Sequence, residues 1–384
     1  MRVIAFYLPQ FHTIPENDEW WGEGFTEWVN VKAAKKLYDW QNQPRVPLNN
    51  NYYCLLDTET QIWQAELAKK YNIYGFCYYH YWFDGHMLLE KPMENMLEEP
   101  RIDIPFCICW ANEDWTNAWV SADAKTLISQ TYGGREEWER HYKYLSKFFK
   151  DSRYIKNGNK PLMIIYRPEI IPCLNEMLDY WEELAIRDGF DGVDFAHQNM
   201  GLDYPVKKDD SRFAFDIEMQ PIYAKTVNAG MGKRKLKDHI LKMMQVLKID
   251  WIRTKINTVK GPKIFDYDEI WNVVLKTPPI SKKSIPCAFV DFDNTSRRKN
   301  EGWLFKGVST EKFGKYFKKL VLKADKEYEN DMMFIFAWNE WAEGGYLEPD
   351  EKNGYGYLEE INKVLIETNE VPRNNNLSEG EGKK

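Results

Sequence analysis

Short apolar runs alternate with amphipathic stretches along most of the chain. The runs are rich in β-branched and aromatic residues, and this alternation is typical of a parallel sheet with crossover helices. Eight runs predict strands: Arg2–Leu8, Tyr74–Tyr81, Ile104–Trp110, Leu162–Arg167, Gly192–His197, Phe213–Met219, Ile285–Asp291 and Met332–Trp338. Eight strands alternating with helices favour a closed (β/α)8 TIM-type barrel over an open sheet.

Segments of helical periodicity fill the spaces between these strands. The third of them ends just before Gly189 and Gly192, and glycine is a common stop signal for a helix. The predicted helices are Thr60–Lys70, Glu136–Lys150, Glu176–Arg187, Lys237–Val246 and Thr310–Glu329.

Two connections are much longer than the others. A Trp-rich segment over residues 10–50 follows the first predicted strand, and a polar stretch runs from the sixth strand to Pro279. Because the loops at the carboxyl ends of barrel strands build the active site, long loops there indicate function. We expect one barrel domain over residues 1–370. Residues 371–384 have too little apolar content to order themselves and predict a disordered tail.

Charge and cysteine content narrow the class of protein. The 384 residues carry a formal net charge of −7, without the basic balance of a nucleic-acid binder. Most of the six cysteines lie in apolar runs and predict reduced thiols. The chain begins on its first strand without a signal-peptide pattern, and no window approaches the roughly 18 apolar residues that span a bilayer. We expect a cytoplasmic protein with no integral membrane segment.

Aromatic residues make up 15% of the chain and include 16 Trp and 23 Tyr. Sugar rings present C–H faces that pack on flat aromatic surfaces, and Tyr and Trp add a polar tip. We therefore expect an oligosaccharide or polysaccharide partner, no nucleic acid and no cofactor or metal. The oligomeric state is not indicated by the sequence.

Polar or aromatic side chains stand at the end of every predicted strand. These ends meet at one mouth of a barrel, so we expect the side chains to converge on a substrate. The expected contacts are Tyr7, Gln10, His12, His80, Trp110, Asn112, Glu113, Arg167, His197, Gln198, Glu218, Asp291, Trp338, Asn339 and Trp341. Gln10, His12 and His197 are equally consistent with bonds to the backbone.

Other charged residues near strand ends have simpler interpretations. Asp291 and Asp293 could form a turn, with a metal site as the alternative. The basic clusters at residues 233–237 and 297–299 are expected to be solvated loops.

Glu340 and Glu343 form the strongest candidate pair. Glycosidic bond cleavage needs one carboxylic acid to protonate the departing oxygen and a second carboxylate as nucleophile or base. The two Glu follow the last predicted strand, flanked by Trp338 and Trp341 and followed by the turn signal Gly344-Gly345. We predict that they are the catalytic residues.

The motifs together resemble a known family, the glycoside hydrolase family 99-like proteins, and within it the WbsX branch linked to polysaccharide and O-antigen biosynthesis. The resemblance runs from Ala5 to about Glu360. Its carriers are Ala5-Phe6-Tyr7-Leu8-Pro9-Gln10-Phe11-His12, Trp21-Gly22-Glu23-Gly24-Phe25-Thr26-Glu27-Trp28, Cys109-Trp110-Ala111-Asn112-Glu113-Asp114-Trp115, residues 161–168 and Trp338-Asn339-Glu340-Trp341-Ala342-Glu343-Gly344. Trp28, in the second motif, completes the expected substrate contacts.

The resemblance implies a (β/α)8 barrel and, in the hydrolase members, retaining endo-cleavage of α-mannosides. In those enzymes the 2-hydroxyl of the substrate attacks the anomeric carbon and forms a 1,2-anhydro sugar. Carried over by motif, Glu340 would be the base for that hydroxyl, and Glu343 would be the acid that later activates water. A base must be ionised while an acid holds its proton, so the two need different environments.

Three functions remain open at this point. The first is a hydrolase or transglycosylase in surface polysaccharide metabolism. These two activities differ only in whether water or a sugar hydroxyl reacts with the intermediate. The second is a sugar-nucleotide-dependent glycosyltransferase in lipopolysaccharide, O-antigen or capsule synthesis, although we find no nucleotide-phosphate loop. The third is a non-catalytic glycan-binding barrel, which the intact carboxylate pair disfavours.

Overall fold

The main sheet of the protein is a parallel barrel. The computed structural model describes residues 1–116, 125–201, 212–230 and 261–372. Within these residues the barrel strands are β1 (Arg2–Tyr7), β2 (Gly75–Phe83), β4 (Phe106–Trp110), β8 (Lys160–Ile165), β9 (Asp194–Asn199), β10 (Phe215–Glu218), β12 (Ser284–Ile285), β13 (Cys287–Phe289) and β15 (Met332–Phe336). Their side chains are almost all buried, as expected for strands covered on both faces.

The barrel closes through one interrupted strand. β12 pairs with β10, β13 pairs with β15, and β15 pairs with β1, all in parallel. Pro286 alone separates β12 from β13, and proline has no backbone N–H to donate to a strand ladder. Counted as one strand, these two pieces complete the predicted eight, and the (β/α)8 prediction is confirmed.

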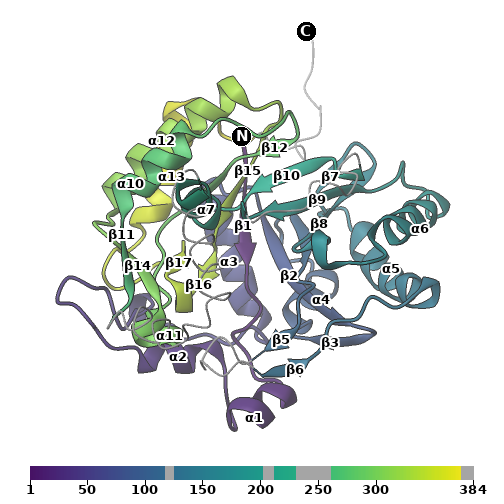
Figure 1. Cartoon of the computed structure of the whole chain (residues 1–384), viewed down its shortest axis with the longest axis horizontal. Helices are drawn as coiled ribbons and strands as arrows, with labels where there is room; N and C mark the ends of the chain where they lie inside the picture. The colour runs from purple at the N-terminus through teal and green to yellow at the C-terminus, as the bar shows by residue number, and fades with distance from the viewer. Residues whose placement is uncertain (117–124, 202–211, 231–260, 373–384) are drawn as a thin grey trace, which may run out of the picture.

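Helices cover the outside of the barrel. Figure 1 shows α5 and α6 on one side and α10, α12 and α13 on the other. The helices that follow barrel strands are α3 (Thr58–Lys70), α4 (Lys91–Glu98), α5 (Arg135–Phe149), α6 (Leu174–Arg187), α7 (Ile222–Gly230), α10 (Tyr267–Lys276), α12 (Thr310–Glu327) and α13 (Gly356–Glu367). Four of the five predicted helices are therefore present. The fifth, Lys237–Val246, lies outside the described residues, as does most of the predicted tail.

α12 illustrates why these segments form helices. The Ser309 hydroxyl accepts a hydrogen bond from the Lys312 N–H at 3.3 Å and caps the first turn. Phe313, Phe317 and Leu320 recur at helical spacing and are buried. The apolar face packs toward the barrel while the lysines on the other face meet solvent.

Short elements and loops extend the carboxyl ends of the strands. Figure 1 shows α1, α2, α11, β5 and β6 gathered at the end of the barrel opposite the chain termini. The elements in these connections are α1 (Pro15–Trp21), α2 (Glu27–Ala33), η1 (Leu48–Asn50), β3 (His86–Leu88), β5 (Trp115–Thr116), β6 (Thr126–Ile128), η3 (Pro168–Ile170), β11 (Lys263–Asp266), α11 (Thr295–Arg298), η5 (Lys299–Glu301), β14 (Trp303–Lys306), β16 (Asn339–Glu340), η6 (Trp341–Glu343) and β17 (Gly345–Tyr346). We call this end the mouth.

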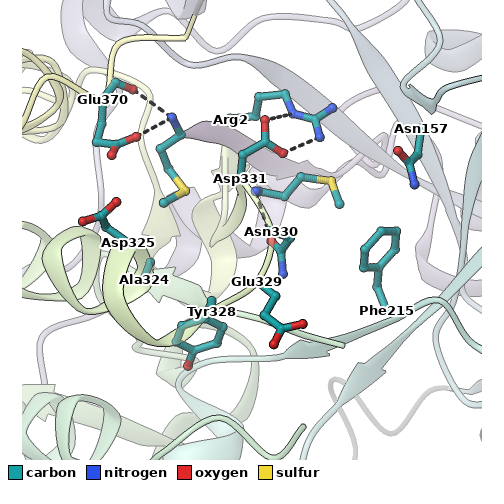
Figure 2. Close-up of a pocket in the computed structure, with 12 residues that line it drawn as sticks. Arg2, Asn157, Phe215, Ala324, Asp325, Tyr328, Glu329, Asn330, Asp331 and Glu370 are labelled. Atoms are coloured by element: carbon teal, nitrogen blue, oxygen red, sulfur yellow. Dashed lines mark hydrogen bonds and ion pairs between the residues drawn. The ribbon is translucent and has the colours of Figure 1, made fainter. Parts of the chain in front are cut away.

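A hollow of about 610 Å³ lies at the opposite end, where the strands begin. Figure 2 shows its lining, which includes Arg2 and Phe215, from the starts of β1 and β10, and Tyr328. Arg2 is paired with Asp331 at 2.6 Å, and β7 (Lys156–Asn157) contributes Asn157. Barrel enzymes build their active sites at the carboxyl ends of the strands. We therefore look for the site at the mouth.

Candidate active site

The segment that carries Glu340 and Glu343 folds as a tight hairpin after β15. β16 pairs with β17 in antiparallel fashion, and η6 connects them. Gly344 has a left-handed φ of 72°, and a Cβ atom there would lie 2.6 Å from the guanidinium of Arg45. Glycine is therefore required for both the turn and the close approach. We call residues 339–344, which carry the two predicted catalytic residues, the catalytic segment.

Asn339 fastens this segment to the first strand. Its side-chain oxygen accepts a hydrogen bond from the Leu8 N–H at 2.8 Å, and its amide nitrogen donates to the Leu8 carbonyl at 3.0 Å. Asn339 is fully buried. The amide satisfies two buried backbone groups, so its position supports a role in holding the segment.

Arg297, in α11, lies between the two carboxyls. Its Nη1 donates to Glu343 at 3.1 Å, its Nη2 to Glu340 at 3.3 Å, and its Nε to Glu27 at 2.9 Å. The Arg297 side chain is 3% exposed, compared with 5% for Glu340 and 18% for Glu343. One buried cation thus contacts three carboxyls, and Glu343 is the more accessible of the two predicted catalytic residues.

These surroundings shift the protonation of the pair. Burial raises the pKa of Glu340 to about 8; Arg297 opposes the shift, and Glu343 and Glu27 add to it. Burial also raises the pKa of Glu343, again opposed by Arg297. Because the two carboxyls are neighbours, their protons belong to the pair. At neutral pH the pair retains a proton, as an acid–base pair requires.

A pocket lined by Glu27 and Arg297, and so adjacent to the carboxyl pair that Arg297 contacts, combines aromatic and polar side chains. Half-buried Trp21, Phe25 and Trp115 line it. The polar residues that line it are Gln10, Asn17, Glu27, Asn30 and Arg297. Flat rings next to amides and charged groups suit a sugar, whose C–H faces and hydroxyls need both.

The inward-facing residues of β2 and β9 approach the same region. Gln10 donates a hydrogen bond to the Tyr81 hydroxyl at 3.2 Å, and Gln198 donates to the Tyr79 hydroxyl at 3.1 Å. The carboxyl of Glu340 contributes to a raised pKa of Tyr81, of which burial is the main cause. Gln10 and Gln198 are thus the predicted contacts that the fold brings toward the carboxyl pair.

Strand alternation turns other predicted residues to the outside of the barrel. The Nε2 atoms of His80 and His141 of α5 are 3.0 Å apart, and burial lowers the pKa of His80 to about 3. Trp110 packs edge-on to the same His141. Tyr7 donates to Gln64 of α3 at 2.6 Å. These three side chains fill the layer between sheet and helices, so the geometry does not support them as sugar contacts.

His197 and Glu218 also lie away from the carboxyl pair. His197 packs against Phe213, with its ring 4.0 Å from the Asp216 carboxyl. Glu218 accepts a hydrogen bond from the Tyr328 hydroxyl at 2.8 Å, and burial raises its pKa to about 7. Tyr328 also lines the hollow at the opposite end of the barrel. His197 and Glu218 have no part in the proposed reaction.

Asn112, Glu113 and Arg167 form a cluster between the loops after β4 and β8. The Asn112 amide donates to the Arg167 carbonyl and accepts from its N–H, both at 2.8 Å. Arg167 pairs with Glu113 and Glu169. Asn112 is fully buried. Glu113 and Arg167 remain partly exposed at the mouth and stay predicted contacts.

The predicted tryptophans pack beneath the mouth. Trp28 donates to the Tyr53 carbonyl at 2.8 Å, and Trp341 donates to the buried carboxyl of Glu348 at 2.7 Å. Trp338 is fully buried, and its ring lies 4.9 Å from that of Phe76. His12 is also buried, which lowers its pKa to about 4. These rings support the catalytic segment from below and do not reach the pocket.

Asp291 and Asp293 hold loops together. Asp291 pairs with Arg45 at 2.6 Å, and Asp293 accepts from Gln41 and Gln43 at 2.9 and 3.1 Å. Among the residues that the structure describes, no group of three or more His, Cys, Asp or Glu side chains is arranged to hold a metal ion. Asp293 also accepts a hydrogen bond from the Thr295 N–H at 3.0 Å, a local bond that favours the turn interpretation for this residue.

Sequence reasoning missed Arg297, Glu27 and Trp21. The interpretation of residues 297–299 as a solvated basic loop is wrong for Arg297, which is 4% exposed. Its charge is buried because three carboxyls from distant segments surround it. Trp21 and Glu27 lie in the motif quoted above, and that motif was the available signal. The cluster at residues 233–237 lies outside the described residues.

Comparison with known proteins shows the family to which the chain belongs. The model of the family described as glycosyltransferase WbsX matches residues 3–361. The chain belongs to the WbsX glycosyltransferase family. The resemblance inferred from the motifs is thereby confirmed. No helix in the described part of this WbsX-family chain combines the length and apolar character needed to cross a membrane.

Curated relatives of the WbsX-family chain occur in Xanthomonas campestris pv. campestris. The uncharacterized protein WxcX of strain B100 and that of a second strain are each 30% identical to it over 372 residues. The match covers 96% of this chain and 50% of each relative. The chain therefore spans about half the length of these relatives.

Solved structures similar to the WbsX-family chain share its fold. The GH99 endo-α-mannosidase from Bacteroides thetaiotaomicron, in complex with Bis-Tris propane, superimposes with a TM-score of 0.56 at 15% identity, covering 96% of this chain and 98% of the mannosidase. A glycoside hydrolase-like protein gives 0.55 at 13% identity, covering 94% and 93%. Family and fold together support a carbohydrate-active enzyme.

Proposed function

We propose that this protein cleaves or transfers an α-linked glycoside, of the α-mannoside type, with retention of configuration through Glu340 and Glu343. The observation that carries the proposal is the contact of both carboxyls with one buried guanidinium beside an aromatic-walled pocket. The substrate would be a surface polysaccharide or one of its oligosaccharide precursors, in keeping with the family.

In the first step, the 2-hydroxyl of the sugar gives its proton to Glu340 while its oxygen bonds to the anomeric carbon. The bond from that carbon to the leaving oxygen breaks, and Glu343 gives its proton to the leaving oxygen. The product is a 1,2-anhydro sugar. The carboxyls have then exchanged roles, with the proton now on Glu340.

In the second step, water or a sugar hydroxyl attacks the anomeric carbon and gives its proton to Glu343. The bond between the anomeric carbon and the 2-oxygen breaks, and Glu340 returns its proton to that oxygen. Each step inverts the anomeric carbon, so two steps retain its configuration. The greater exposure of Glu343 suits a group that must meet both the leaving group and the acceptor.

The resting proton must move before this reaction begins. Burial raises the pKa of Glu340 to about 8 in the free protein, which favours a protonated Glu340, whereas the first step needs an ionised one. A bound 2-hydroxyl that donates to Glu340 would stabilise its ionised form. Substrate binding is therefore expected to transfer the shared proton to Glu343.

Product analysis in heavy-oxygen water tests the proposal. The protein is incubated with α-mannosyl oligosaccharides or a bacterial surface glycan, and the products are examined by mass spectrometry. Hydrolysis is expected to place the heavy oxygen in the new reducing sugar, and transfer to yield longer, unlabelled products. New products with the opposite anomeric configuration, or no products from any α-linked glycan, would contradict the proposal.

A nucleotide-sugar donor is the second candidate, favoured by the glycosyltransferase description of the family. Calorimetry with a panel of nucleotide sugars separates the two candidates. Under the first proposal none of them is expected to bind. Binding of one donor, with transfer of its sugar to an oligosaccharide acceptor, would replace the hydrolase-type mechanism.

Removing the Trp21 ring is expected to weaken substrate binding. Trp21 lines the pocket without a role in proton transfer, so Trp21→Ala should raise KM about tenfold, with a smaller change in kcat. Steady-state kinetics measure both. Trp40→Ala is the matched control, since Trp40 stacks on Tyr38 outside this pocket. Equal effects of the two variants would argue against this pocket as the sugar site.

A further inference from the structure

We propose that Arg297 and Glu27 are positioning residues that fix the catalytic pair and set how many protons it holds, an inference that rests on the function proposed above. The guanidinium of Arg297 uses a different nitrogen for each carboxyl: Nε for Glu27, Nη1 for Glu343 and Nη2 for Glu340. Nη2 also lies 3.5 Å from the Gln10 side-chain oxygen. A planar fork of donors can serve several acceptors at once, which an ammonium cannot do with the same geometry.

The backbone holds Arg297 in register with the catalytic segment. The Asp293 N–H donates to the Glu343 carbonyl at 2.6 Å, and the Ser296 hydroxyl donates to the Ala342 carbonyl at 2.5 Å. These bonds join the chain just before Arg297, in and ahead of α11, to η6. Arg297 and the catalytic segment are therefore held in fixed positions relative to each other, as one unit.

Glu27, in α2, connects this unit to the segment that follows β1. Its N–H donates to the Gln10 carbonyl at 3.3 Å, and its side chain accepts from Asn30 at 3.0 Å. Glu27, Gln10 and Arg297 all line the pocket. The ion pair between Glu27 and Arg297 thus joins α2 to α11, and through Arg297 to the catalytic segment, along the lining of the pocket.

The charges at this point do not balance if every carboxyl is ionised. Three carboxyls face one buried guanidinium, and Arg298 acts on Glu343 from farther along α11. Tyr81 from β2 and Tyr166 from the end of β8 are neutral, because burial raises the pKa of both hydroxyls. Buried like charges favour proton uptake. Glu27 thus offsets part of the positive charge of Arg297. Less of that charge acts on Glu340 and Glu343, which favours a proton on the pair.

Two variants should move the pH profile in opposite directions. Glu27→Gln keeps the shape and an acceptor oxygen but removes one charge, so more of the Arg297 charge acts on the pair. The acid limb of kcat/KM is expected to move about 0.5–1 pH unit lower. Arg297→Lys keeps the charge but loses the fork, and the acid limb should move higher, with a larger fall in kcat than in substrate affinity.

Thermal unfolding as a function of pH gives a readout that needs no substrate. The folded-state pKa of Glu340, about 8, lies above its ordinary value of 4.5. The folded protein therefore binds more protons than the unfolded chain between these values, and stability falls as pH rises through this window. Glu27→Gln should make the fall smaller. Glu340→Gln should remove the share that Glu340 contributes, while buried Glu218 and Glu348, whose pKa values are raised to about 7, keep theirs.

The outcomes separate this inference from the proposed function. Glu301→Gln, at an exposed carboxyl, is the control and should follow the wild type in both measurements. If no glycan is turned over, the unfolding curves still test whether Glu27 and Arg297 set the protonation of the pair. If Arg297→Lys fails to fold, Glu27→Gln alone tests it. Curves for Glu27→Gln that superimpose on those of the wild type would overturn the inference.

Discussion

Glu343→Gln is expected to lower turnover of an α-linked oligosaccharide by about 10²–10⁴-fold without unfolding the protein. Glutamine preserves the shape and can still accept from Arg297, but it cannot give a proton to the leaving oxygen. Glu340→Gln should cost as much, because the amide cannot take the proton of the 2-hydroxyl. Turnover and circular dichroism of both variants, beside the exposed control Glu301→Gln, measure these effects.

The leaving group distinguishes the roles of the two residues. A glycosyl fluoride needs little protonation to depart, so the bond-cleaving step of Glu343→Gln should recover much of its rate with this substrate. Glu340→Gln should stay impaired, because a better leaving group does not replace the base that takes the proton of the 2-hydroxyl. Recovery of Glu340→Gln instead would reverse the two roles, and full activity of both variants would remove the pair from the mechanism.

Asn339→Asp is expected to destabilise the protein by about 3–5 kcal/mol. The Asn339 amide both accepts from the Leu8 N–H and donates to the Leu8 carbonyl, in a fully buried position. An aspartate of the same shape cannot donate when ionised, so a buried charge would face a carbonyl oxygen. Urea unfolding at neutral pH measures the loss.

The pH dependence of this variant identifies the cause. Burial should raise the pKa of the new carboxyl, so it would be protonated at low pH, donate to Leu8 again and recover stability. Asn300→Asp, at an exposed position, is the control. If Asn339→Asp keeps its stability and raises KM instead, Asn339 contacts the sugar as first predicted from the sequence.

The distribution of apolar residues was sufficient to predict the barrel. Each barrel strand is a short buried run, because it is covered on both faces. Helices such as α5 and α12 bury apolar residues at helical spacing, because only one side of each faces the sheet. The position of the Glu340 and Glu343 pair at the mouth also follows from local order, since both come directly after the last strand. The exact ends of the helices and strands, and the interruption at Pro286, were not predicted and are seen only in the structure.

Which polar residues face the substrate was not predictable in the same way. Successive side chains of a strand point to opposite faces, so Tyr79 and Tyr81 turn inward while His80, predicted as a contact, points to α5. A shift of one residue in judging where a strand ends exchanges the two sets. Which side chains line the mouth therefore depends on the register of each strand. The apolar run does not specify that register.

The sequence by itself determined the barrel, the family and the carboxyl pair, because these depend on local repeats and on motifs that are contiguous in the chain. Only the tertiary structure decided that Arg297, in a basic run, is buried against Glu27, Glu340 and Glu343. These contacts join residues up to 270 positions apart. The charge of a side chain is readable from sequence, but its burial and its partners depend on which loops meet at the mouth.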